Sequence, residues 1–212
     1  MPRFVDPEQR KNAIIDAASR ALAEEGYARF TLRSLARRMG GSSTLVTHYF
    51  PTKDEVVSAL VDRALAEAEV KSGELAGIED PHQRLHAVIE YFLPLDDDAL
   101  TQERVRVALA SHRGSEPALD DFFARMEPGM RDLFRLGLRG LVKPKDVEGL
   151  VDVIRAWTNG VVLSVVEHPE IWTPERQLAA LELFMNMLPI PSLRSSAPTR
   201  QRTSTRSSRA AS

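Results

Sequence analysis

The sequence predicts an all-α protein in which an N-terminal three-helix domain with a helix-turn-helix precedes a C-terminal helical bundle. Apolar residues recur at i, i+3, i+4 and i+7 through most of the chain, and strand-like alternation is absent. Proline, glycine and capping residues mark the ends of these periodic segments. We expect residues 1–54 to form the N-terminal domain, 55–190 the helical bundle, and 191–212 a disordered basic tail.

The composition excludes some classes of protein and shows where the charge lies. None of the 212 residues is cysteine, which excludes a disulfide scaffold or a thiolate metal site. There is no charged-then-apolar leader and no apolar run near 18 residues, so we expect a soluble, cytoplasmic protein without membrane contact. The net charge is +3 in residues 1–54, −10 in 55–188 and +5 in 189–212. Basic ends of this kind suit contact with phosphate groups.

The stretch 31–53 has the pattern of two short helices that meet at a glycine corner. Thr31 supplies an N-cap oxygen ahead of an apolar i, i+3, i+4, i+7 row. Gly40 suits the left-handed position that ends a helix, and Ser42 can cap a second helix over residues 43–50. Two helices joined by so tight a turn cross steeply, which is the geometry that places a recognition helix in the DNA major groove.

The outer face of the second helix carries hydrogen-bonding groups and no acid. Val46 and Phe50 are four residues apart and point inward, which turns the polar residues outward. Hydroxyls and imidazole can bond to phosphates and base edges. The residues expected to contact DNA are Ser42, Ser43, Thr44, Thr47 and His48, with Thr31, Arg33, Tyr49 and Lys53 toward the backbone. A plain helical hairpin without a DNA role would show the same spacing.

Three motifs in the segment from Arg10 to Glu55 carry a family resemblance. They are AIIDAASRALAEEGYARFT, LRSLARRMG and the run S-x-T-L-V-T-H-Y-F-P-x-K. The segment resembles the N-terminal DNA-binding domain of the TetR family of bacterial transcriptional regulators. It departs from the usual pattern at Gly41, Thr44 and Thr47, where the family has valine, glycine or proline, and tyrosine. The resemblance implies a dimeric repressor that a small-molecule effector releases from a palindromic double-stranded DNA operator.

The remainder of the chain reads as a connecting helix and a body of further helices. The connecting helix starts at the capping box that begins with Thr52 and continues to Glu69, and residues 73–79 read as a linker. Body helices are expected at 80–93, 98–112, 118–141, 146–166 and 173–188, the third kinked at Pro128-Gly129. In the family that the chain resembles, an effector displaces the connecting helix and changes the spacing of the two DNA-reading domains.

Two kinds of ligand site are suggested by the body. Flexible and aromatic side chains near Pro128, joined by residues of a later helix, could enclose a small apolar molecule, although ordinary core would look the same. The candidate effector contacts are Phe92, Phe123, Met126, Met130, Trp157 and Asn159. His82, His86 and Glu90 have metal-ligand spacing on one helix, but solvated side chains are the simpler reading, so we predict no metal and no cofactor.

The last two helices carry more apolar faces than one thin body can bury. Their pattern of small residues, Gly160, Pro169-Glu170 and Thr173-Pro174-Glu175 resembles the C-terminal part of betaine-repressor-type TetR regulators. Pairing with a second copy in a four-helix bundle would cover them. The expected homodimer contacts are Val153, Gly160, Val161, Ser164, Leu178, Leu181 and Met185.

Two other functional classes compete with a DNA-binding regulator. An enzyme would need a catalytic motif, and the chain has no G-x-S-x-G, no glycine-rich phosphate loop and no cysteine, so we predict no enzymatic activity. A helical protein-interaction module with a vestigial DNA-reading domain is the remaining alternative. The operator, the regulated genes and the effector are not encoded in any recognisable pattern.

Overall fold

The computed structural model describes residues 6–114 and 116–190, and within these residues the chain is helical and has no strand. The expected basic tail, 191–212, lies outside the described residues. The helices are α1 (Pro7–Glu25), α2 (Leu32–Arg38), α3 (Ser43–Tyr49), α4 (Lys53–Ala76), α5 (Pro81–Tyr91), α6 (Asp97–Ala110), α7 (Pro117–Leu138), α8 (Val147–Glu167) and α9 (Pro174–Met187), with a 3₁₀ turn η1 (Pro144–Asp146) before α8.

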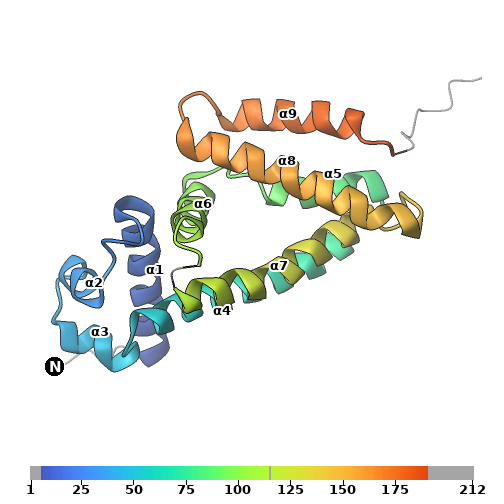
Figure 1. Cartoon of the computed structure of the whole chain (residues 1–212). Helices are drawn as coiled ribbons and strands as arrows, with labels where there is room; N and C mark the ends of the chain where they lie inside the picture. The colour runs from blue at the N-terminus through green and yellow to red at the C-terminus, as the bar shows by residue number, and fades with distance from the viewer. Residues whose placement is uncertain (1–5, 115, 191–212) are drawn as a thin grey trace, which may run out of the picture.

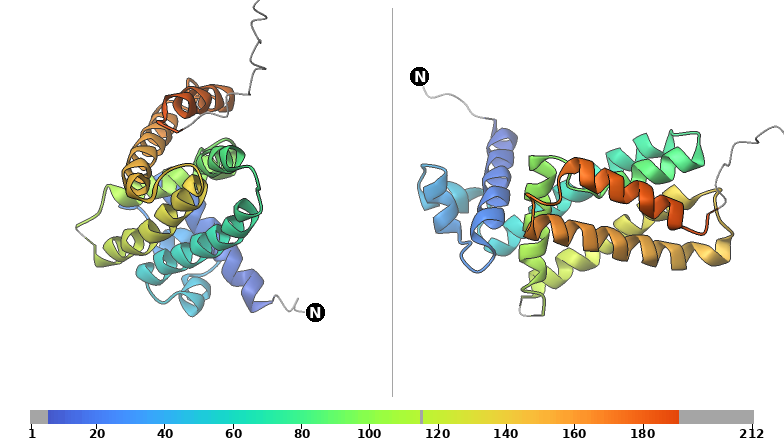
Figure 2. Two further views of the ribbon diagram at one scale, coloured as in Figure 1. Left: turned by 90° about the vertical axis from the view of Figure 1, so that its right-hand side faces the viewer. Right: turned by 90° about the horizontal axis from the view of Figure 1, so that it is seen from above.

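The three N-terminal helices form a head at one end of an elongated body (Figure 1). Helix α4 leaves the head and packs along α7, while α1 packs against α6. Helices α8 and α9 lie together as an outer layer on the side of the body opposite α4 (Figure 2). The predicted fold class, an N-terminal helix-turn-helix unit followed by a helical bundle, is therefore confirmed.

Two hydrophobic cores hold the molecule together. The first combines α1 to α3 and the first half of α4 with Val105, Leu109, Leu119 and Phe122 from α6 and α7. The second joins the end of α4 to α5, α7, α8 and α9. Because the first core includes residues on both sides of position 54, the head is packed into the body and is not a separately tethered unit.

Helix α4 is longer than the sequence pattern predicts. It was expected to end near Glu69, ahead of a linker at 73–79, but it continues through Gly73 to Ala76. A glycine inside a helix costs about 1 kcal/mol. Leu75 is only 2 % exposed and belongs to the second core, and its burial offsets that cost. The other helices end within three residues of their expected positions, and α7 continues as one helix through Pro128.

Arg84 connects α5 to the α4–α5 turn and to the C-terminal end of α7. Its side chain is nearly buried, and its guanidinium donates to the carbonyl oxygens of Ile78, Leu136 and Arg139. These carbonyls belong to the α4–α5 turn and to the C-terminal end of α7, where backbone acceptors lack helical partners. The buried charge is therefore stabilised by peptide dipoles, and no carboxylate among the described residues pairs with it.

Helix α8 passes a simple length and composition test for a membrane span. No apolar run of this length was expected from the sequence, but the segment Pro144–Glu167 is apolar enough over its 24 residues. In the fold, one side of α8 lies in the second core, and Val153 and Leu163 on another side are exposed. Its hydrophobicity therefore reflects two apolar faces of a helix in a folded body.

An ion network ties α8 to α7. Arg131 and Arg135 on α7 both donate to the carboxylate of Glu148 on α8, and Arg131 also bonds to Asp152. The hydrogen bonds from Arg135, and then those from Arg131, lower the pKa of Glu148 from 4.5 to about 2. The bonds require the ionised carboxylate, so this contact is a pH-dependent part of the stability.

We therefore expect Glu148→Gln to reduce stability in a pH-dependent manner. Since the folded-state pKa is depressed, the contribution of Glu148 is complete above pH 4.5 and is lost as the pH falls toward 2. The urea midpoint of the variant should lie below that of the wild type at pH 7, and the difference should shrink below pH 4.5. Glu69→Gln, an exposed change on α4, is the control. A difference that persists unchanged to pH 3 would contradict the assignment.

Candidate nucleic-acid interface

The corner between α2 and α3 is closed by a glycine-dependent turn. Gly40 has φ +65°, and its N–H donates to the carbonyl of Arg37 at 3.1 Å. The N–H of Gly41 donates to the carbonyl of Ala36, also at 3.1 Å. These two bonds form a Schellman motif, which needs a left-handed residue at the position of Gly40. The turn fixes the angle at which α3 leaves α2.

Helix α2 is fixed at both ends. Thr31 caps it as predicted: its side-chain oxygen accepts from the N–H of Ser34 at 3.0 Å, and the Ser34 hydroxyl accepts from the N–H of Thr31. This reciprocal pair is a capping box. At the other end, Arg38 bonds to Glu24 and Glu25 at the end of α1. Helix α2 is thereby held as a support for α3.

Helix α3 presents the predicted polar face to solvent. Val46 is fully buried and Phe50 is nearly so, and both belong to the first core. The exposed residues are Ser42, Ser43, Thr44, Thr47 and His48, while Tyr49 is half-buried against the core. The Thr47 hydroxyl donates back to the carbonyl of Ser43 at 3.1 Å, so it offers an acceptor and a methyl group outward.

The first turn of α3 has no side-chain cap. Ser42 occupies the N-cap position, but its hydroxyl makes no capping hydrogen bond, contrary to the expected cap. The N–H of Leu45 donates to the carbonyl of Ser42 at 3.1 Å, which leaves the N–H groups of Ser43 and Thr44 with the capacity to bond. The hydroxyl of Ser42 and these N–H groups lie beside the exposed face, where phosphate oxygens would be suitable acceptors.

Lys53 has a structural partner that the sequence did not reveal. Its ammonium donates to the carbonyl of Tyr27 at 2.9 Å and lies 3.3 Å from the centre of the Tyr27 ring. Burial lowers the pKa of Lys53. The contact fastens the first turn of α4 to the loop after α1, so the phosphate contact predicted for Lys53 competes with an internal bond.

Arg33 and Arg37 are exposed cations without an ion pair among the described residues. They are four residues apart and therefore project from the same side of α2. Arg33 was predicted to contact the DNA backbone and Arg37 was not, although their i, i+4 spacing indicates a shared face. Both can reach phosphate without breaking an existing salt bridge.

The predicted effector contacts do not form one cluster. Phe123 and Met126 pack against the first core, whereas Phe92 and Trp157 pack against the second. Phe92 contacts Phe134, and Trp157 stacks on Phe184 with ring centres 4.2 Å apart. The Asn159 side chain bonds to Arg155, and Met130 is half-buried on α7.

Met126 lines a partly enclosed cavity of about 120 Å³ where the head meets the body. We call it the junction cavity. Its walls come from α1, α4, α6 and α7, and its lining residues are Ser19, Leu60, Arg63, Ala64, Glu67, Gln102, Glu103, Val105, Arg106, Phe122 and Met126. None of the other predicted effector contacts lines it.

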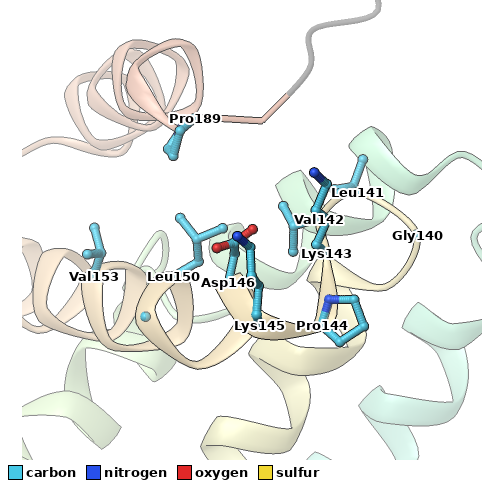
Figure 3. A pocket seen from close by; sticks show the side chains of 11 residues that line it. Gly140, Leu141, Val142, Lys143, Pro144, Lys145, Asp146, Leu150, Val153 and Pro189 are labelled. Atoms are coloured by element: carbon cyan, nitrogen blue, oxygen red, sulfur yellow. The ribbon is translucent and has the colours of Figure 1, made fainter.

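A larger hollow of about 1010 Å³ lies at the far end of the body. It is formed by the α7–α8 connection, where Lys143, Lys145 and Asp146 surround it, and Pro189 faces them across the opening (Figure 3). The hollow is open to solvent and distant from the head. We therefore regard it as a surface depression and not as the effector site.

The predicted dimer contacts include residues that the fold buries within one chain. Val161 and Leu181 are 6 % and 0 % exposed and belong to the second core, so they cannot contact a partner. Val153 and Gly160 are exposed on α8, and Ser164, Leu178 and Met185 are half-buried. The large apolar side chains exposed on α8 and α9 are Val153, Leu163, Leu183 and Met187.

His86 bridges two helices and binds carboxylates. Its ring nitrogens lie 3.3 Å from Glu90 on α5 and 2.9 Å from Glu182 on α9. No group of three His, Cys, Asp or Glu residues within 6–114 and 116–190 is arranged to hold a metal ion. Of the three residues with metal-ligand spacing, His82, His86 and Glu90, it is His86 that forms the α5–α9 contact, and Glu90 lies beside it on α5.

The steep α2–α3 corner, the exposed polar face of α3 and the helical body together define a DNA-binding regulator of the helix-turn-helix class. Residues 14–60 match the sequence model of the tetR family of bacterial regulatory proteins. Residues 81–188 match that of the C-terminal domain of BetI-type transcriptional repressors. The chain belongs to the TetR family and carries a body of the BetI type.

Individual relatives agree with this assignment. The regulator BetI of Rhizobium meliloti is 24 % identical over 166 residues, which cover 77 % of this chain and 81 % of that protein. BetI of Burkholderia ambifaria is 34 % identical over 91 residues, 42 % of this chain and 47 % of that protein. A transcriptional regulator from Rhodococcus sp. Rha1 superposes with a TM-score of 0.74 at 25 % identity, covering 86 % of this chain and 95 % of its own.

A fold of the same kind occurs in a transcriptional regulator from Saccharomonospora viridis that was solved in complex with choline. Its TM-score is 0.77 at 19 % identity, and the match covers 88 % of this chain and 100 % of that one.

The contact of Lys53 can be tested against its predicted role at phosphate. Lys53→Met should reduce the free energy of unfolding by about 1–3 kcal/mol, because a charged hydrogen bond and a cation–π contact are lost. Arg33→Met is the matched control and should change stability by less than about 0.5 kcal/mol. Urea denaturation of both variants measures this. Unchanged stability of Lys53→Met would show that the Tyr27 contact contributes little.

Proposed function

We propose that this protein is a homodimeric repressor that binds a palindromic operator through α3 and releases it when a small molecule binds in the body. The observation that carries this proposal is the exposed, acid-free face of α3 on a head that matches the tetR family. The proposal includes a cytoplasmic location and no catalytic activity.

The DNA contacts follow from the geometry of α2 and α3. Ser43, Thr44, Thr47 and His48 occupy the exposed face that would enter the major groove, and they can read base edges or phosphates. Thr31, Arg33 and Arg37 on the supporting helix, with Tyr49 and the uncapped turn at Ser42, would hold the backbone. Lys53 is a weaker candidate because its ammonium already bonds to Tyr27.

The proposed dimer interface is the outward apolar stripe of α8 and α9. Val153, Gly160 and Leu163 lie on one exposed side of α8, and Leu183 and Met187 lie on the exposed side of α9, with side-chain exposures up to 79 %. Paired with a second copy, these surfaces would form a four-helix bundle. Two-fold symmetry would place two α3 helices on successive half-sites of an operator.

The proposed effector is a small organic molecule. A structurally similar regulator was solved with choline, and another, SmeT, was solved with triclosan at a TM-score of 0.67 and 20 % identity. The proposal concerns the size of the effector, that of a small organic molecule, and its location in the body.

The decisive experiment is fluorescence anisotropy of the full chain with duplex from upstream of its own gene and with scrambled duplex. Titrations at several salt concentrations separate sequence-specific from phosphate-only binding. A preference for the native duplex that survives added salt supports the proposal. Equal binding of both duplexes, or none, favours the alternative that the chain is a protein-interaction module.

His48 provides a residue-level test in the same assay. His48→Ala should weaken operator binding by about 1–3 kcal/mol, because an imidazole that reads a base loses its hydrogen bond. Binding to scrambled duplex should change little. His168→Ala, an exposed histidine after α8, is the control. An unchanged operator affinity for His48→Ala would remove this residue from the interface.

The dimer can be tested with Leu183→Arg. Leu183 is 68 % exposed in the single chain, so the substitution should leave the fold intact and introduce two like charges into the paired stripe. Sedimentation velocity should show a dimer for the wild type and a dimer affinity at least tenfold weaker for the variant. Val70→Arg, equally exposed but on α4, should remain dimeric. A Leu183→Arg protein that stays dimeric would place the interface elsewhere.

A further inference from the structure

The junction cavity has an apolar floor and walls that carry charges of both signs. Leu60, Val105 and Phe122 are buried beneath it, and Ala64 and Met126 complete the apolar surface. Its volume of about 120 Å³ corresponds to about four water molecules at liquid density. The cavity is therefore large enough for the side chain of a small metabolite whose polar end remains near the opening.

The α6 wall offers hydrogen-bond donors. The Nε atom of Arg106 donates to Glu103 at 2.6 Å, and this pair is largely buried, with both side chains 22 % exposed. The two terminal nitrogens of Arg106 have no hydrogen-bond partner among residues 6–114 and 116–190. A guanidinium with both terminal nitrogens available is suited to a carboxylate.

The α4 wall offers an acceptor. Glu67 is linked only weakly to Arg63, with 3.9 Å between the Arg63 Nε and a carboxylate oxygen, and its side chain is 53 % exposed. An ammonium group bound beside Glu67 would therefore meet a carboxylate that is only weakly paired.

Simple anions and cations each match only part of this lining. Two arginines and two glutamates surround the cavity, so a purely anionic ligand would meet the glutamates and a purely cationic ligand would meet the arginines. A zwitterion satisfies both walls, since its carboxylate can bond to Arg106 and its ammonium to Glu67. Its apolar part would lie on Phe122 and Met126.

We propose that the junction cavity binds a small zwitterion, a free amino acid with an apolar side chain, which bridges α4 and α6. The proposal deepens the proposed function, because it assigns an effector class to a site at the base of the head. The binding of the amino acid does not rest on the proposed function; only the effect of that binding on DNA affinity does.

The position of the cavity connects its occupant to the DNA-reading head. Arg63, which lines the cavity on α4, bonds to Asp16 and Ser19 on α1. The preceding residue, Asp62, bonds to Arg125 on α7. Helix α4 is therefore tied to the head through one residue and to the body through its neighbour. An occupant that engages Glu67 beside Arg63 would act on the contact between α4 and α1 and so change operator affinity.

The binding test uses isothermal titration calorimetry of the full chain without DNA. The probes are L-alanine, L-valine, L-leucine and L-methionine, with isovalerate and isobutylamine as the matched anion and cation of valine. At least one of the four amino acids should bind. Isovalerate and isobutylamine should each bind at least tenfold more weakly than valine, or than the tightest-binding amino acid if that is not valine. No binding by any amino acid, or equal binding by an analogue, overturns the proposal.

Substitutions place the bound amino acid in the junction cavity. Arg106→Met and Glu67→Gln should each weaken binding at least tenfold. Arg104→Met on α6 and Glu69→Gln on α4 change the same charges outside the lining and should not weaken binding. Ala64→Leu, which fills the cavity, should also abolish binding, and circular dichroism checks that it folds. Equal effects of the lining and control variants would overturn the assigned location.

Fluorescence anisotropy of the operator duplex, measured with and without the tightest-binding amino acid, tests whether occupation of the cavity changes DNA binding. Operator affinity should change at least fivefold at saturation, and Arg106→Met should remove the change. Failure of the proposed function appears as a lack of operator preference before any amino acid is added. Calorimetric binding with an unchanged operator affinity would overturn the regulatory role of the site.

Discussion

The arrangement of this protein depends on a single hydrophobic core that the DNA-reading head shares with the body. Val56, Val57 and Leu60 on α4 are buried together with side chains of α1 on one side and of α6 and α7 on the other. Protein interiors are close-packed and deform in discrete steps. The head therefore cannot change its angle unless α4 or α6 repacks, which links the position of α3 to events in the body.

Polar contacts determine which parts of this core move together. Lys53 fastens the start of α4 to the head at Tyr27, and Arg63 fastens its middle to α1. Beyond Leu65, α4 belongs to the second core, where Arg84 joins the α4–α5 turn to the end of α7. The Arg63–Asp16 contact is a partly exposed salt bridge, which contributes little to stability on its own. Together these polar contacts act by position, because they set which helix follows α4 when it shifts.

The sequence was sufficient where local chemistry decides the structure. The Thr31 cap, the turn at Gly40 and the outward face of α3 each depend on residues within one or two helical turns, and the structure contains all three. It was insufficient where distant packing decides. Leu75 extends α4 through a glycine, and the partner of Lys53 lies 26 residues away. No periodicity encodes either contact.

The residues predicted for the dimer and effector sites lie in surroundings that differ from those expected, and the differences have a common physical origin. Helix α8 has apolar side chains on most of its circumference, so periodicity alone does not distinguish the side that meets its own core from the side that could meet a partner. Val161 proved to face inward and Leu163 outward, although they are two residues apart. Aromatic residues near Pro128 likewise divide between the two cores, where the sequence predicted one shared lining. A cavity forms where core side chains fail to meet, and one such place among the described residues is the junction of α1, α4, α6 and α7, where an occupant would touch both α4, which runs through both cores, and the base of the head.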